Sequence, residues 1–189
     1  MSKRIHTIQS SDKKEFDKEV NFFLELGCEL HDGGYEVIKK DNETVYSQVV
    51  VFDTNKYVVK FYENGRIEQL GSLNKDGIVD GLWTWWQDNG QKSWELPFKD
   101  GKEDGLSTSW RKKGQKSSEV NYKDGKKNGL MTFWYENGQK KYERTYKDGK
   151  QEGIETWWYE NGQKNSEYTF KDGKLIFSKN WFSDGSVWE

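Results

Sequence analysis

The sequence contains no alanine, one proline, one cysteine and two histidines among its 189 residues. Because alanine fills undemanding helix positions, its absence argues against a helical bundle. A single cysteine, Cys28, excludes an internal disulfide framework and a cysteine-based zinc site. The formal net charge is only −2, so the strongly basic surface of a duplex nucleic-acid binder is lacking.

Long apolar runs are also missing. No segment approaches the roughly 18 consecutive apolar residues of a membrane-spanning helix, and the N-terminus leads into no apolar run. We therefore expect neither a signal peptide nor membrane insertion, and we predict a cytoplasmic protein.

Aromatic residues and glycine are abundant instead: ten Trp, ten Tyr, ten Phe and 19 Gly. Disordered chains are poor in aromatic residues and carry a large net charge, so this composition favours a folded protein. The glycines indicate many tight turns that need a positive φ.

A 24-residue repeat dominates the chain after its first fifty-odd residues. Asp-Gly pairs recur at that interval, beginning at Asp76, Asp100, Asp124, Asp148 and Asp172. A second series of turn glycines lies between them, at Gly65, Gly90, Gly114, Gly138, Gly162 and Gly185. Short β-branched or aromatic segments separate the turns, a pattern that predicts one β-hairpin per repeat. We expect a mainly β fold, an elongated single-layer antiparallel sheet that grows by about 10 Å per repeat.

Three columns of residues barely change between repeats. They are Leu82, Leu106, Leu130 and Ile154; Thr84, Thr108, Thr132 and Thr156; and Trp86, Trp110, Trp134 and Trp158. Their spacing of two puts the three columns on one face of the strand. Because a position fixed in every repeat builds the repeat, we assign this face, including Trp134, to packing.

Two other columns vary. One contains Trp85, Ser109, Phe133 and Trp157, and the other contains Trp94, Ser118, Tyr142 and Ser166. Trp85 is one residue from Trp86, so its column lies on the opposite face. Large aromatic residues at variable surface positions are typical anchors for a protein partner. The predicted partner-binding residues are Trp85, Trp94, Phe133, Tyr142 and Trp157.

Residues with catalytic or metal-binding chemistry are sparse. The acidic column Glu95, Glu119, Glu143 and Glu167 is interpreted as structural, bonded to Lys92, Lys116, Lys140 and Lys164 or to the hairpin backbone. The aspartates of the Asp-Gly turns lack the dense oxygen ligands of a calcium loop. His6, His31 and Cys28 come with no nucleophile that has an orienting partner. We therefore predict no enzyme activity, no cofactor and no metal.

Three irregularities mark the array. An extra residue in Leu70-Gly71-Ser72-Leu73 predicts a β-bulge. Pro97 falls inside a strand, so its missing N–H must point outward or lie at a bulge. A further glycine follows each Asp-Gly pair of the earlier repeats by four residues, at Gly81, Gly105, Gly129 and Gly153. Phe177 stands at that position in the last repeat, and one residue is missing before Asp184. This change should close the last sheet edge against further stacking.

The units Trp134–Lys140 and Tyr146–Gly153, with their siblings, resemble the bacterial variant of the MORN (membrane occupation and recognition nexus) repeat, over roughly residues 56–189. Proteins built this way include the YwqK-type antitoxin group. The resemblance implies a non-catalytic scaffold, an antitoxin or immunity-type factor that neutralises a toxin or effector protein by binding. The alternative is a carbohydrate-, small-molecule- or nucleotide-binding module with exposed aromatic platforms, from a phage or mobile element.

Residues 1–53 lack the repeat and predict a separate β-α-β-β domain, with the array occupying residues 54–189. Strands are expected at Lys3–Gln9, Glu29–Ile38 and Thr44–Phe52. Between them, Asp12 and Glu15 form a capping box, apolar residues follow at helical spacing, and Gly27 ends the helix. Phe16–Phe52 resembles a family of small bacterial domains of unknown function, which implies no activity. The oligomeric state stays open.

Overall fold

The computed structural model describes the backbone of residues 3–10, 29–30, 36–40 and 43–53, and both backbone and side chains of Lys14 and residues 56–188. Backbone contacts divide the chain into two compact units, Met1–Val59 and Lys60–Glu189.

The N-terminal unit contains a small antiparallel sheet. Strand β1 (Lys3–Ser10) pairs along β4 (Glu43–Asp53), while β2 (Glu29–Leu30) and β3 (Glu36–Lys40) both pair with β4. The strands expected at Lys3–Gln9 and Thr44–Phe52 are confirmed. The strand expected at Glu29–Ile38 is present as two segments, β2 and β3. Lys14 is helical, and the rest of the expected helix lies outside the described residues, as do His31 and Cys28.

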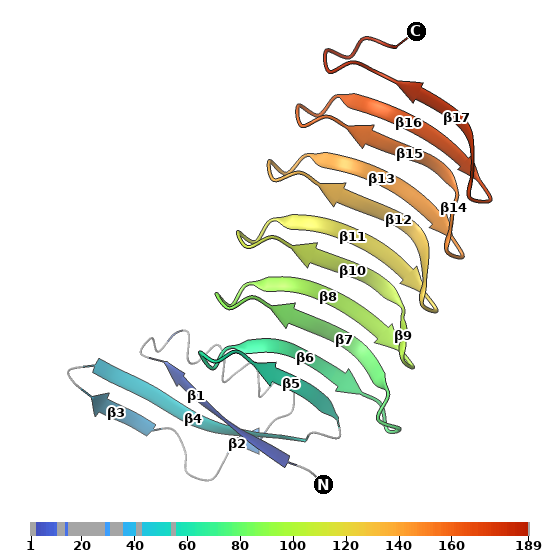
Figure 1. Ribbon diagram of the computed structural model, residues 1–189. Helices are drawn as coiled ribbons and strands as arrows, with labels where there is room; N and C mark the ends of the chain where they lie inside the picture. Colours follow the sequence, from blue (N-terminus) through green and yellow to red (C-terminus); the bar gives the residue numbers. More distant parts are fainter. Residues whose placement is uncertain are drawn as a thin grey trace. The chain divides into compact units, whose positions relative to one another are not determined.

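The second sheet has 13 antiparallel strands in a single row (Figure 1). Its strands are β5 (Tyr57–Phe61), β6 (Ile67–Leu73), β7 (Val79–Trp86), β8 (Lys92–Lys99), β9 (Lys102–Glu103), β10 (Gly105–Trp110), β11 (Lys116–Lys123), β12 (Lys126–Trp134), β13 (Lys140–Lys147), β14 (Lys150–Gln151), β15 (Gly153–Trp158), β16 (Lys164–Lys171) and β17 (Lys174–Asn180). Each strand pairs with its neighbours in sequence, and β9 and β14 are short pairings beside β8 and β13. The predicted stack of hairpins in one sheet is confirmed.

The Asp-Gly turns explain why the hairpins repeat so regularly. Asp124 has φ 50° and Gly125 has φ 78°, two consecutive residues with positive φ. This is the signature of a type I′ turn, which suits the twist of paired strands and strongly favours Asp-Gly. The Gly125 amide donates to the Glu103 carbonyl of the preceding repeat at 2.9 Å. The four turns at Asp100, Asp124, Asp148 and Asp172 therefore also tie their hairpins to the repeat before.

Both predicted strand irregularities are present. The register of β6 against β7 shifts between Leu70 and Ser72, which confirms the bulge. Strand β8 pairs with β10 through Glu95 and with β9 from Phe98 onward. Pro97 lies in the interruption between these two pairings, and its carbonyl accepts from the Asp104 amide at 3.0 Å. The ladder is thus broken at the residue that lacks an N–H.

The C-terminal edge is covered over a shorter length than expected. Trp181 bridges to Val187, and the Trp188 amide donates to the Asn180 carbonyl at 3.1 Å. Among the described residues, no strand pairs with the outer edge of β17 from Lys174 to Lys179. The expected closure of the sheet edge is therefore limited to Asn180, the last residue of β17, and Trp181, which follows it.

The burial of the repeated columns differs from the expectation. The threonines are buried, with Thr132 only 4% exposed, but Leu82, Leu106, Leu130 and Ile154 are 46–55% exposed. Leu106 and Leu130 lie opposite the shorter Asn121 and Thr145, and a single-layer sheet has no second layer to cover them. We call this side the leucine face.

The opposite side contains the more deeply buried apolar residues. Leu96 is 2% exposed, and Trp83, Val120 and Met131 are also buried. The variable Trp85, Phe133 and Trp157 on this side are half-buried, and so is the fixed Trp134, which strand alternation puts on the leucine face. The expected contrast in burial between fixed and variable aromatic columns is therefore absent. We call this side the aromatic face.

Side chains bond one repeat to the next at the end of the sheet that carries the second series of turns, most of which are Asn-Gly. The hydroxyls of Tyr62, Tyr135 and Tyr159 donate to the carbonyls of Trp86, Trp158 and Trp181 at 2.7–2.9 Å. Asn137 Nδ2 donates to the Glu160 carbonyl at 2.7 Å, and its siblings bond likewise. These bonds run along the array and add to the backbone ladders.

The acidic column has the predicted structural role. Each glutamate pairs with the lysine three residues earlier: Lys92–Glu95, Lys116–Glu119, Lys140–Glu143 and Lys164–Glu167. Exposed pairs of this kind contribute little stability individually, about 0–1 kcal/mol. Their regular placement keeps each carboxylate partnered beside the buried threonines.

Gly71 gives a direct test of how tightly the first repeat packs. A Cβ on Gly71 would lie 2.0 Å from Cδ2 of Trp83, so Gly71→Ala should lower the free energy of unfolding by about 1–3 kcal/mol. In a Trp83→Ser background, which places the residue found at Ser107 in the next repeat, the same alanine should cost almost nothing. Urea unfolding of the four proteins measures this coupling, and an equal loss in both backgrounds would contradict the packing.

Candidate functional site

The five predicted partner-binding residues lie on the aromatic face in two clusters. Trp85 stacks on Trp94 with ring centroids 4.7 Å apart. Tyr142 lies between Phe133, at 4.6 Å, and Trp157, at 4.5 Å. The members of each pair face each other directly across neighbouring strands, so the hairpin register positions the rings. Such pairs contribute about 0.5–1.5 kcal/mol beyond the area they bury.

Small hydroxyl residues separate the two clusters. Ser109 and Ser118 occupy the equivalent aromatic positions, and their Oγ atoms lie 2.7 Å apart. Trp94 Nε1 donates to Ser107 Oγ at 2.7 Å. This bond satisfies the indole N–H of Trp94, which is the most exposed of the five predicted residues. The face therefore changes along the array from tryptophans, through serines, to the cluster centred on Tyr142.

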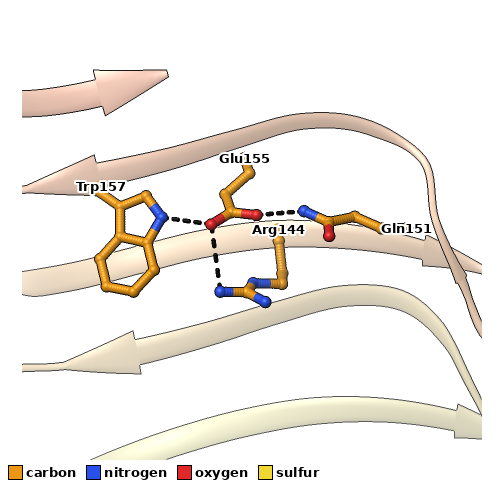
Figure 2. A network of polar contacts seen from close by, with 4 residues as sticks. All are labelled: Arg144, Gln151, Glu155 and Trp157. Atoms are coloured by element: carbon orange, nitrogen blue, oxygen red, sulfur yellow. Dashed lines mark hydrogen bonds and ion pairs between the residues drawn. The ribbon is translucent and has the colours of Figure 1, made fainter. Parts of the chain in front are cut away.

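A charged network supports the second cluster (Figure 2). Glu155, on β15, accepts hydrogen bonds from Arg144 Nη2 at 3.2 Å, from Gln151 Nε2 and from Trp157 Nε1. The Arg144 guanidinium lies 4.6 Å from the Tyr142 ring centroid and 5.8 Å from that of Trp157. One carboxylate thus fixes both the cation and the indole of the cluster.

Arg144, Gln151 and Glu155 were not predicted as site residues from the sequence. A usable signal was present: the positions equivalent to Glu155 in the other repeats are Trp83, Ser107 and Met131. A carboxylate among those residues breaks the pattern of its column. Arg144 departs from its column in the same way, because the equivalent residues of the two preceding repeats are the apolar Leu96 and Val120.

The electrostatics keep the cluster neutral overall. Burial raises the pKa of Tyr142, and nearby Arg144 partly opposes that shift. Tyr142 is therefore an uncharged phenol at neutral pH, and Glu155 balances the charge of Arg144. Arg144 Nε is buried without a hydrogen-bond partner among the described residues. Chemically, the cluster can make apolar, cation–π and hydrogen-bonding contacts.

Other kinds of site are not evident in the described ranges. Within them, no group of three or more His, Cys, Asp and Glu side chains is placed to hold a metal ion. No helix among those residues is long and apolar enough to cross a membrane.

Two segments of the chain, residues 127–148 and 151–172, match the family model of the MORN repeat variant. Together they contain Phe133, Tyr142, Arg144, Glu155 and Trp157. No curated protein matches the sequence.

Two solved structures show a low similarity. The crystal structure of TarM is 11% identical over 51% of this chain and 19% of TarM, with a TM-score of 0.33. An S. aureus TarM mutant in complex with fondaparinux, alpha-GlcNAc-glycerol and UDP is 10% identical over 64% and 21% of the two chains, with a TM-score of 0.30. The chain thus spans about a fifth of the TarM length, and a likeness this low indicates no function.

The Arg144–Glu155 pair can be tested by exchange with its own siblings. The side chains are 21% and 8% exposed, so Glu155→Ala leaves a largely buried cation and should cost about 3 kcal/mol or more. The double variant Arg144→Val/Glu155→Ser installs the residue types of Val120 and Ser107 and should cost less than the single change. Chemical denaturation compares them, and a double variant as unstable as Glu155→Ala would contradict this account.

Proposed function

We propose that this chain is a non-catalytic protein-binding scaffold whose aromatic face holds the partner. MORN repeats are as a rule binding repeats without catalytic activity, and two segments of the chain match that family. The anchors are Trp85, Trp94, Phe133, Tyr142 and Trp157.

One observation carries the proposal: the variable aromatic residues form clusters whose geometry is set by the fold before any partner binds. The Glu155 carboxylate bonds both Arg144 and Trp157, and the two neighbouring rings hold Tyr142. Anchors that are already ordered lose little entropy on binding, which favours affinity. Aromatic residues and arginine are also the types enriched at binding hot spots.

The same geometry favours a protein over a sugar as ligand. Stacking on a sugar requires a free ring face, whereas both faces of Tyr142 are covered by Phe133 and Trp157. The edges of the rings and the guanidinium remain for contact. Edge contacts of mixed apolar and polar character suit the core of a protein interface.

We further infer that the partner is a toxin or effector and that binding neutralises it, as in the YwqK-type antitoxin group that the repeats resemble. A partner captured from the native host with the tagged full chain should be toxic when expressed alone. Co-expression of this chain should restore growth. A captured partner that is harmless would contradict the antitoxin role but not the binding face.

Substitutions on the two faces test the binding role. Phe133→Ser/Trp157→Ser should weaken binding of the purified partner by at least about 2 kcal/mol per anchor, roughly 30-fold each. The same variant should lose some stability, because its ring pairs are broken. Affinity is measured by titration calorimetry at a temperature where both proteins are folded.

Leu106→Ser/Leu130→Ser is the matched control, because each leucine is 46% exposed on the leucine face, on β10 and β12. It should leave affinity unchanged. If the leucine variant loses binding while the aromatic variant keeps it, the partner binds the opposite face.

A further inference from the structure

One position in the inter-repeat ladder differs from the others. Tyr62, Tyr135 and Tyr159 each reach the tryptophan carbonyl of the next repeat, and Arg111 reaches the Trp134 carbonyl at 2.5 Å. Gln87 occupies the same position of the first full repeat. Among the described residues, no side chain donates to the Trp110 carbonyl that Gln87 would have to reach. The ladder is therefore interrupted between Trp86 and Trp110.

A cavity lies at this interruption. It has a volume of about 710 Å³, is open to solvent, and is lined by Trp86 and Trp110, with Tyr62, Gln87 and Arg111. A smaller cavity of about 390 Å³ lies further along the array. Its ladder residues are Arg111 and Tyr135, whereas the larger cavity has Tyr62, Gln87 and Arg111.

Two buried polar atoms of residues that line the cavity lack hydrogen-bond partners among the described residues. Gln87 Oε1 is an acceptor and Arg111 Nε is a donor, and both residues line the cavity. Buried polar groups are normally satisfied, and leaving one unpaired is costly. A hydroxyl group can donate to an amide oxygen or accept from a guanidinium N–H. A carboxylate could pair with the arginine but not with the amide oxygen.

We propose that this cavity is a binding site for a phenol ring, supplied by a tyrosine side chain of a bound protein. The ring takes the space between Trp86 and Trp110 that a ladder tyrosine would fill. Its hydroxyl donates to the Trp110 carbonyl, as the Tyr62 hydroxyl donates to the Trp86 carbonyl one repeat earlier. The volume fits within the range of ligand pockets and leaves room for the peptide backbone beside the ring.

The inference extends the proposed function, because it names a side chain of the partner. Its test needs no partner: p-cresol, the side-chain analogue of tyrosine, is titrated into the full chain. We expect saturable binding at one site, followed by NMR of the labelled indole groups, with shifts confined to Trp86 and Trp110. Toluene, which lacks the hydroxyl, should bind with an affinity at least about tenfold lower than that of p-cresol. Equal affinity for both probes, or shifts spread over all indoles, would overturn the site.

Gln87→Tyr should fill the cavity from within. It is expected to abolish p-cresol binding and to raise the melting temperature by a few degrees, because the ladder becomes continuous. Unchanged p-cresol affinity in this folded variant would overturn the proposal.

A substitution at Tyr135 should create a second p-cresol site, which is the counterpart of filling the first one. Tyr135→Gln should open a second site and change the stoichiometry from one p-cresol to two. Tyr135→Phe removes only the hydroxyl bond of 2.8 Å and should keep a stoichiometry of one. The site is refuted if both variants bind the same number of probe molecules. Loss of partner binding by Phe133→Ser/Trp157→Ser is a separate readout, so the two proposals can fail independently.

Discussion

A single-layer sheet has no second layer against which to bury its side chains, and the rest of this structure follows from that constraint. Each residue of the array can be covered only by neighbours in the same sheet. Large rings cover more than aliphatic side chains do, which accounts for 30 aromatic residues in a chain without alanine. Even so, only a few apolar residues of the array, Leu96 foremost, are fully buried.

Bonds between repeats compensate for the thin core. Backbone ladders, Asp-Gly turn amides, and the Tyr and Asn side chains at the other end all link one hairpin to the next. Nearest-neighbour linkage of this kind makes stability a sum of local terms, as in other repeat proteins. Positions that take no part in the linkage are free to differ, and the two aromatic clusters lie at such positions. The Gln87 cavity lies at a linkage position, where glutamine stands in place of a bonded tyrosine or arginine.

The sequence was sufficient to predict the hairpins and the irregularities at Leu70 and Pro97, because turn chemistry and spacing are local. The aromatic residues of both clusters were found for the same reason. It was not sufficient to predict burial: the repeated Leu130 is half exposed, while Trp83 of a variable column is buried. A residue type that recurs in every repeat indicates that the position is needed, but it does not indicate whether neighbouring side chains bury it. The Arg144–Glu155 pair was missed because its two residues meet only across β13 and β15.

Hydroxyl-radical footprinting of the chain, alone and bound to its partner, tests the central claim most directly, since it reports the solvent access of side chains on each face. The account predicts that Trp94, Phe133 and Trp157 lose reactivity in the complex, whereas Leu82, Leu106, Leu130 and Ile154 on the other face stay as reactive as in the free protein. Protection of the four aliphatic residues with unchanged aromatic reactivity would contradict it.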